Sequence, residues 1–208
     1  VAHFAVDTEE DGLQLIRKLL SFLPQNNLEE TPLVECKDPI DRLDDVLNDI
    51  IPDNANQSYD MYEVIGTIVD NNEFLEVHAD YAKNIIVGFA RFNGQSVGIV
   101  ANQPKVMAGC LDSNASRKAG RFVRFCDAFS LPVVTFVNCP GFESIKSATK
   151  ASAAYAEATT VKISVVTGKA IGSGYVALAG TGANADVVYA LPDAVISPVN
   201  VEAAAFIM

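Results

Sequence analysis

The residues best suited to chemistry in this sequence are Gly172, Ser173 and Gly174, which lie between two apolar runs. The run 163–167 predicts a buried strand, and the run 175–179 predicts the opening of a helix. A strand that turns through glycine into a helix leaves free backbone N–H groups at the helix start, where they stabilise negative charge. We therefore predict an electrostatic site of the kind used in acyl transfer. Close packing of the helix on the strand is the alternative interpretation of the two glycines.

Patterns for a nucleophile or a metal site are otherwise scarce. Ser173 does not lie in a G-x-S-x-G pattern, and neither His3 nor His78 is placed to activate it. The cysteines have no C-x-x-C spacing, so we expect no metal site in this chain. Scattered thiols in a chain with a large core are typical of a reduced, cytoplasmic protein. They are Cys36, Cys110, Cys126 and Cys139.

Charge is unevenly distributed along the chain. Of the net charge of −11, residues 1–80 contribute 19 acids against 4 bases, whereas residues 81–208 have 7 acids against 11 bases. The acidic first part argues against nucleic acid as a partner. No apolar run approaches the roughly 18 residues of a membrane helix, so membrane insertion is not expected.

The surrounding pattern predicts the elements that position the glycine turn. An Asn93-Gly94 pair between two apolar runs predicts a β-hairpin. Apolar spacing predicts helices over 9–23, from Asp60, over 113–129, over 147–158 and from Ser173, and strands over 133–137, 162–167 and 185–190. Residues 24–60 are acidic and contain prolines, so we expect a connector there. Strands that alternate with helices predict an α/β fold with a largely parallel sheet.

Several segments of the chain resemble the carboxyltransferase (β) subunits of biotin-dependent acyl-CoA carboxylases, of the propionyl-CoA carboxylase type. The segments that carry the resemblance are 81–91, 98–104, 109–112, 121–129, 140–142, 155–159 and 168–170. The resemblance implies a crotonase-like superhelix of ββα units. It also implies that residues 1–40 are the tail of an N-terminal domain with an interdomain link. Residues 41–208 would then be a C-terminal carboxyltransferase domain, cut before its last helices.

The resemblance also implies roles for the residues of the turn and its neighbours. The backbone N–H groups of Ser173 and Gly174 match the pair that faces the biotin oxygen, and Val176 follows on the acyl side. Biotin's own nitrogen can take the α-proton, so no catalytic histidine is required. The residues expected on the biotin side are Gly172, Pro140, Gly141, Phe142, Asn102 and Gln103. The loop after Phe142 is several residues shorter than is usual in the family, which affects this biotin side.

The function implied by the resemblance is carboxyl transfer from carboxybiotin to the α-carbon of a short-chain acyl-CoA such as propionyl-CoA or acetyl-CoA. The cofactor is biotin carried by a partner, and no metal is expected. The implied partners are acyl-CoA, a biotin carboxyl carrier protein or domain, a biotin carboxylase subunit, and further copies of the chain as a dimer or a trimer of dimers. A biotin-dependent acyl-CoA decarboxylase subunit and a non-catalytic scaffold on the same fold are the alternatives. We expect an isolated fragment to be inactive.

Overall fold

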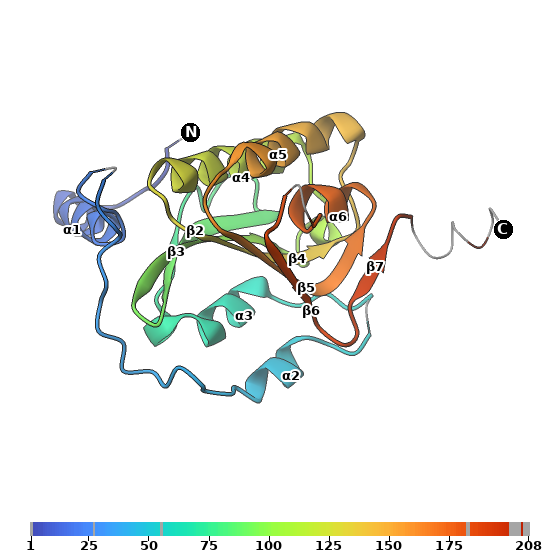
Figure 1. Ribbon diagram of the computed structural model, residues 1–208, viewed down its shortest axis with the longest axis horizontal. Helices are drawn as coiled ribbons and strands as arrows, with labels where there is room; N and C mark the ends of the chain where they lie inside the picture. The colour runs from blue at the N-terminus through green and yellow to red at the C-terminus, as the bar shows by residue number, and fades with distance from the viewer. Residues whose placement is uncertain (1, 27, 55, 182–183, 200–204, 206–208) are drawn as a thin grey trace.

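The fold is built on one sheet of seven strands, within a computed structural model that describes residues 2–26, 28–54, 56–181, 184–199 and 205. The first six strands follow the order β1-β2-β3-β4-β5-β6 across the sheet, and β7 pairs with β5 (Figure 1). Their bounds are β1 Leu75–Glu76, β2 Ile85–Phe92, β3 Gln95–Asn102, β4 Val133–Cys139, β5 Lys162–Ile171, β6 Val187–Ala190 and β7 Val195–Ser197.

The sheet combines an antiparallel hairpin with a parallel part, which confirms the predicted α/β fold. Strands β1, β2 and β3 pair antiparallel, whereas β3 to β6 and the β5–β7 pair are parallel. In the predicted turn, Asn93 (φ 49°) and Gly94 (φ 78°) both adopt the left-handed conformation that the tight hairpin turn requires. The Asp70 carboxylate accepts hydrogen bonds from both backbone N–H groups, at 3.0 and 2.6 Å.

Helices cover both faces of the sheet (Figure 1). One face carries α4 (Ser113–Ala128), α5 (Ile145–Glu157) and α6 (Ser173–Leu178), and the other carries α2 (Val46–Ile50) and α3 (Met61–Ile68). Helix α1 (Glu9–Leu20) lies beside the hairpin, and two short 3-10 turns span Asp70–Asn72 and Met107–Gly109. The order of helices and strands therefore places α6 and its glycine turn on the α4–α5 side of the sheet.

Two apolar clusters hold these layers together, one on each face of the sheet. Strand β2 shows why, because successive side chains of a strand point to opposite faces. Ile85, Val87 and Phe89 belong to the cluster under α4, α5 and α6, whereas Ile86 and Ala90 belong to the cluster under α3. A strand that is buried on both faces is an apolar run, as the sequence of β2 is.

Side-chain caps fix where the predicted helices begin. Asp112 accepts from Ala115 N at 2.8 Å at the start of α4, and Asp60 accepts from Tyr62 N at 3.1 Å at the start of α3. Ser144 caps α5 in the same way, so this helix begins at Ile145, two residues before the predicted start. Apolar spacing predicted the helix type, and the caps decide the boundaries.

The structure departs from the predicted elements in the connector, in two short strands, in β5 and in α1. The connector contains the short helix α2, held by Leu47 against the cluster under α3, and the two- and three-residue strands β1 and β7 were not predicted. Strand β5 is longer than predicted and runs to Ile171. Only part of the predicted apolar face of α1 packs on the core: Leu19 contacts the core cluster, whereas the Ile16 side chain is 52% exposed.

None of the helices in the described part of the chain has the length and apolar character needed to cross a membrane. All four cysteines are free; Cys126 and Cys139 are buried in the core, and Cys36 and Cys110 are half-buried.

Candidate active site

The glycine turn joins the end of β5 to α6, as predicted. Gly172 has φ 54° and ψ −120°, a conformation that residues with a side chain rarely adopt. Its N–H donates to Ser197 O of the neighbouring strand β7 at 2.9 Å, and its carbonyl accepts from Val176 N at 3.1 Å. The turn is therefore fixed from both sides, by a strand and by the first bond of the helix.

The next two backbone N–H groups, of Ser173 and Gly174, have no acceptor among the described residues. They belong to the first turn of α6, where no preceding helical carbonyl can accept from them. Gly174 is buried against β4: a Cβ added there would lie 2.8 Å from Cys139 Sγ and 3.0 Å from Cys139 O. The two adjacent donors thus lie at a helix start that packs closely on β4, where a larger residue than glycine would require a shift.

Two of the predicted biotin-side residues, Gly141 and Phe142, lie against this turn, and Pro140 precedes them in the same loop. Phe142 N donates to Ser173 Oγ at 3.3 Å. Gly141 has φ 146°, and its carbonyl accepts from Leu111 N at 3.1 Å. The structure therefore brings the 140–142 loop and the glycine turn together, although 30 residues separate them in sequence.

A groove of about 960 Å³ opens beside the turn. Its walls come from α5, from α6 and from the β7 region, and Val176, the predicted acyl-side residue, is 58% exposed in it. Apart from the Tyr175 phenol, none of the described lining residues has an ionisable side chain. The lining residues are Ile145, Ala148, Thr149, Ser152, Ala153, Ala156, Gly172, Ser173, Tyr175, Val176, Ala177, Ile196, Ser197 and Pro198.

The contributions of α5 and β7 to this groove were not predicted. The small residues Ala148, Ser152 and Ala153 recur on one side of α5, which is a signal that helix packing explains equally well. Ile196 comes from a three-residue strand, which is too short to show periodicity in sequence. Pairing of β7 with β5 is what places it beside the turn.

The structure does not bring Asn102 and Gln103 to the turn. Asn102 is fully buried, and its Nδ2 donates to Gly109 O at 3.1 Å. Gln103 Nε2 donates to Asp60 Oδ1 at 2.8 Å, which directs this side chain toward the start of α3. Both residues hold the segment that follows β3, and their place on the biotin side stays a prediction.

The thiol closest to the turn is not a nucleophile. Burial raises the pKa of Cys139 to about 12, so this side chain is a neutral thiol at physiological pH. Its Sγ donates to Gly141 O at 3.3 Å. Cys139 therefore packs under Gly174 and supports the loop, and the chemistry of the groove rests on the backbone donors and on Ser173.

Two buried basic side chains, Lys118 and His78, lie on another part of the fold, around the 78–85 turn. Lys118 Nζ donates to Tyr81 O and Ile85 O, both at 2.8 Å, and burial lowers the pKa of this ammonium to about 8. The pKa of His78 is lowered to about 4, first by burial and then by the nearby His3 and other cationic groups. None of these side chains lines the groove, so they support the structure around β2.

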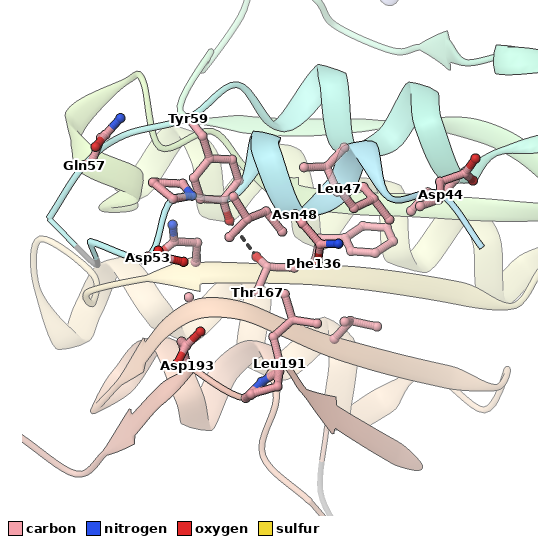
Figure 2. A pocket seen from close by; sticks show the side chains of 18 of the residues that line it. Asp44, Leu47, Asn48, Asp53, Gln57, Tyr59, Phe136, Thr167, Leu191 and Asp193 are labelled. Carbon is pink, nitrogen blue, oxygen red and sulfur yellow. Dashed lines mark hydrogen bonds between the residues drawn. The ribbon is translucent and has the colours of Figure 1, made fainter.

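A second cavity, of about 580 Å³, lies on the opposite face of the sheet, between the α2–α3 segment, strands β4 and β5 and the segment that follows β6 (Figure 2). Tyr59 reaches into it and its hydroxyl lies 2.8 Å from Thr167 Oγ1. Asp53 and Asp193 stand at its rim, and the described lining residues include no lysine or arginine. Such a rim repels phosphates and carboxylates, so the groove beside Ser173 is the better candidate for anionic substrates.

Among the described residues, one group offers three possible metal ligands: Cys36, Asp38 and Asp70 have ligand atoms within 4.8 Å of one another. Both carboxylates already serve the fold. Asp38 pairs with Arg42 at 3.0 Å, and Asp70 holds the hairpin turn. Structural hydrogen bonding accounts for this cluster, and it lies apart from the groove lining.

Comparison with known proteins identifies the family. The pattern of the carboxyl transferase domain matches residues 1–208. The chain is 52% identical to the methylmalonyl-CoA decarboxylase subunit alpha of Veillonella parvula and 46% identical to the propionyl-CoA carboxylase carboxyltransferase subunit of Haloferax mediterranei. Both matches cover 100% of this chain, and they cover 43% and 42% of the two relatives.

A solved structure agrees with these matches. The transcarboxylase 12S hexamer with hydrolysed methylmalonyl-CoA bound superposes with a TM-score of 0.94 at 45% identity, over 99% of this chain and 42% of that one. The predicted crotonase-like fold is confirmed by this likeness. The chain spans about two fifths of the length of the relatives that it matches. By sequence and by fold, the chain belongs to the carboxyl transferase domain family.

Proposed function

We propose that this chain supplies the biotin-side half of a biotin-dependent acyl-CoA carboxyltransferase. In this proposal, the N–H groups of Ser173 and Gly174 donate to the ureido oxygen of biotin. The observation that carries it is the pair of adjacent backbone donors without acceptors among the described residues. Ser173 lines an open groove of almost entirely neutral side chains, and Gly174 follows it, buried against β4. Family membership supports the choice of substrates.

The proposed reaction needs charge stabilisation rather than a side-chain base. Carboxybiotin, a substrate delivered by a carrier, loses CO₂ when its N–C bond breaks and the electron pair returns to the ureido group. The ureido nitrogen takes the α-proton of the acyl-CoA, and the resulting α-carbanion bonds to CO₂. Negative charge develops on oxygen at both stages, and preorganised N–H donors stabilise such charge better than water does.

The other residues of the turn hold these donors in place. Gly172 and Gly141 permit the two backbone conformations that bring the loop against α6. Val176, which is exposed in the groove, is proposed to contact the acyl chain. Because this side chain is apolar, it suits a short aliphatic acyl group and provides no partner for a charged one.

The rest of the active enzyme is proposed to come from outside this chain. We propose acyl-CoA, a biotin carboxyl carrier, a biotin carboxylase subunit and further copies of the chain as partners. Residues 1–40 are proposed to be the end of a preceding domain with a link, and residues 41–208 a C-terminal carboxyltransferase domain. The 52% identity with a decarboxylase subunit favours one alternative: the same site would move the carboxyl group from an acyl-CoA to biotin, which is the reverse step.

Carboxyl exchange in the assembled protein tests the proposal in both directions. Isotope from labelled methylmalonyl-CoA should appear on a biotinylated carrier, and label from carboxybiotin should appear on propionyl-CoA. The direction that runs in the presence of the natural partners then distinguishes carboxylase from decarboxylase. Binding of acyl-CoA and carrier without exchange in either direction would contradict the proposal and would favour the non-catalytic scaffold.

A further inference from the structure

The side chain of Ser173 has a place in the groove that the proposed backbone donors do not explain. Its Oγ accepts a hydrogen bond from Phe142 N at 3.3 Å, and Ser173 lines the groove. A hydroxyl has one proton to donate in addition to its acceptor sites. No described residue accepts that proton, so it is available to a molecule in the groove.

We propose that the Ser173 hydroxyl is a third hydrogen-bond donor to the charge that the Ser173 and Gly174 N–H groups stabilise, and that it ties the 140–142 loop to the turn. This inference rests on the proposed function. A hydroxyl that accepts from an N–H becomes a better donor, because hydrogen bonds in a chain polarise one another. The Phe142 N–H therefore strengthens the Ser173 donor and also fixes its position.

The surroundings of Ser173 favour a donor over a nucleophile. A serine nucleophile needs an adjacent base within hydrogen-bond reach. The described groove lining contains no histidine, aspartate, glutamate or lysine, and the thiol of Cys139 is engaged with Gly141 O. The hydroxyl is therefore expected to keep its proton throughout the reaction and to stabilise charge without forming a covalent bond.

Two substitutions separate this role from the backbone role, because both keep the N–H of residue 173. In the assembled protein with its biotinylated carrier, Ser173→Ala should lower kcat for carboxyl transfer by about 10- to 100-fold with little change in the KM for acyl-CoA. Ser173→Thr keeps a hydroxyl and should recover most of the rate. Hydrogen exchange at the Phe142 amide gives an independent readout: it should accelerate in Ser173→Ala and return toward the wild-type rate in Ser173→Thr.

The outcomes distinguish this inference from the proposed function. Transfer by Ser173→Ala at the wild-type rate would overturn the role of the hydroxyl and would leave the backbone donors standing. An equal loss of kcat in Ser173→Ala and Ser173→Thr would show that restoring a hydroxyl does not restore the rate, and it would also overturn the inference. Absence of transfer in the wild-type protein would overturn the proposed function itself, and this inference with it.

Discussion

The buried glycine at the start of α6 allows a sharp prediction about the proposed donors. A methyl group added by Gly174→Ala would lie 2.8 Å from Cys139 Sγ, 3.0 Å from Cys139 O and 3.1 Å from Cys139 Cβ. Non-bonded carbon atoms normally lie about 3.5–4.0 Å apart. Since Cys139 belongs to the buried strand β4, the turn has to move away from the strand by roughly 0.5–1 Å.

Such a shift affects activity more than stability. Alanine within a helix gains about 1 kcal/mol over glycine, whereas overpacking costs about 1–3 kcal/mol, so the free energy of unfolding should fall by no more than about 2 kcal/mol. Hydrogen bonds weaken steeply when their length or angle departs from the optimum. Loss of one donor of this kind costs about 10²- to 10³-fold in kcat, and we expect that loss in carboxyl exchange by the assembled Gly174→Ala protein.

A matched control and a rescue variant make the test specific. Gly98→Ala produces the same kind of contact elsewhere, because its added Cβ would lie 2.5 Å from the Sγ of the buried Cys126. It should lower stability without lowering the exchange rate of the folded protein. Adding Cys139→Ala to Gly174→Ala removes the contact with Sγ and should restore part of the rate. Folded Gly174→Ala protein with an exchange rate within about threefold of wild type would refute the predicted displacement of these donors.

Three further predictions concern the framework around the site. Lys118→Met should lower the free energy of unfolding by about 2–3 kcal/mol in urea titrations, because the carbonyls of Ile85 and Tyr81 lose their donor. Unchanged stability would contradict the structural role of the Lys118 ammonium. The pKa of His78 is lowered from 6.5 to about 4, so the unfolded state binds this proton first and stability should fall as pH falls from 6.5 to 4. In thermal melts, His78→Gln should flatten this dependence of stability on pH. An unaltered slope would contradict the role of His78. Asp70→Asn leaves one of the two turn amides without its carboxylate acceptor, so the free energy of unfolding in urea should fall by about 1.5–3 kcal/mol. The Gly94 N–H should also exchange faster with solvent. Equal exchange in the wild-type and variant proteins would disprove the contact.

Strong local signals in the sequence allowed the central elements to be predicted. The Asn93-Gly94 pair specifies a hairpin turn by its conformational preference, and Asp60 and Asp112 specify helix starts by their capping chemistry. The turn at Gly172 was predicted for the same kind of reason, since glycine permits the positive φ that the structure shows there.

What could not be predicted depends on contacts between distant segments. Ile196 joins the groove through the pairing of β7 with β5. The contact of Phe142 with Ser173, whose common place on the biotin side only the family resemblance implied, comes from the packing of a loop on a helix. Neither contact leaves a local pattern in the sequence. Asn102 was placed on the biotin side by the family resemblance, and that place stays a prediction, because a strand end carries no information on which way its side chain turns.

A structure of the assembled protein with its biotinylated carrier tests the central claim most directly. We predict the ureido oxygen of biotin within roughly 2.7–3.1 Å of both Ser173 N and Gly174 N, in the groove between α5 and α6. Biotin bound with this oxygen more than about 3.5 Å from both nitrogens, or bound in the acidic cavity beside Tyr59, would contradict the account.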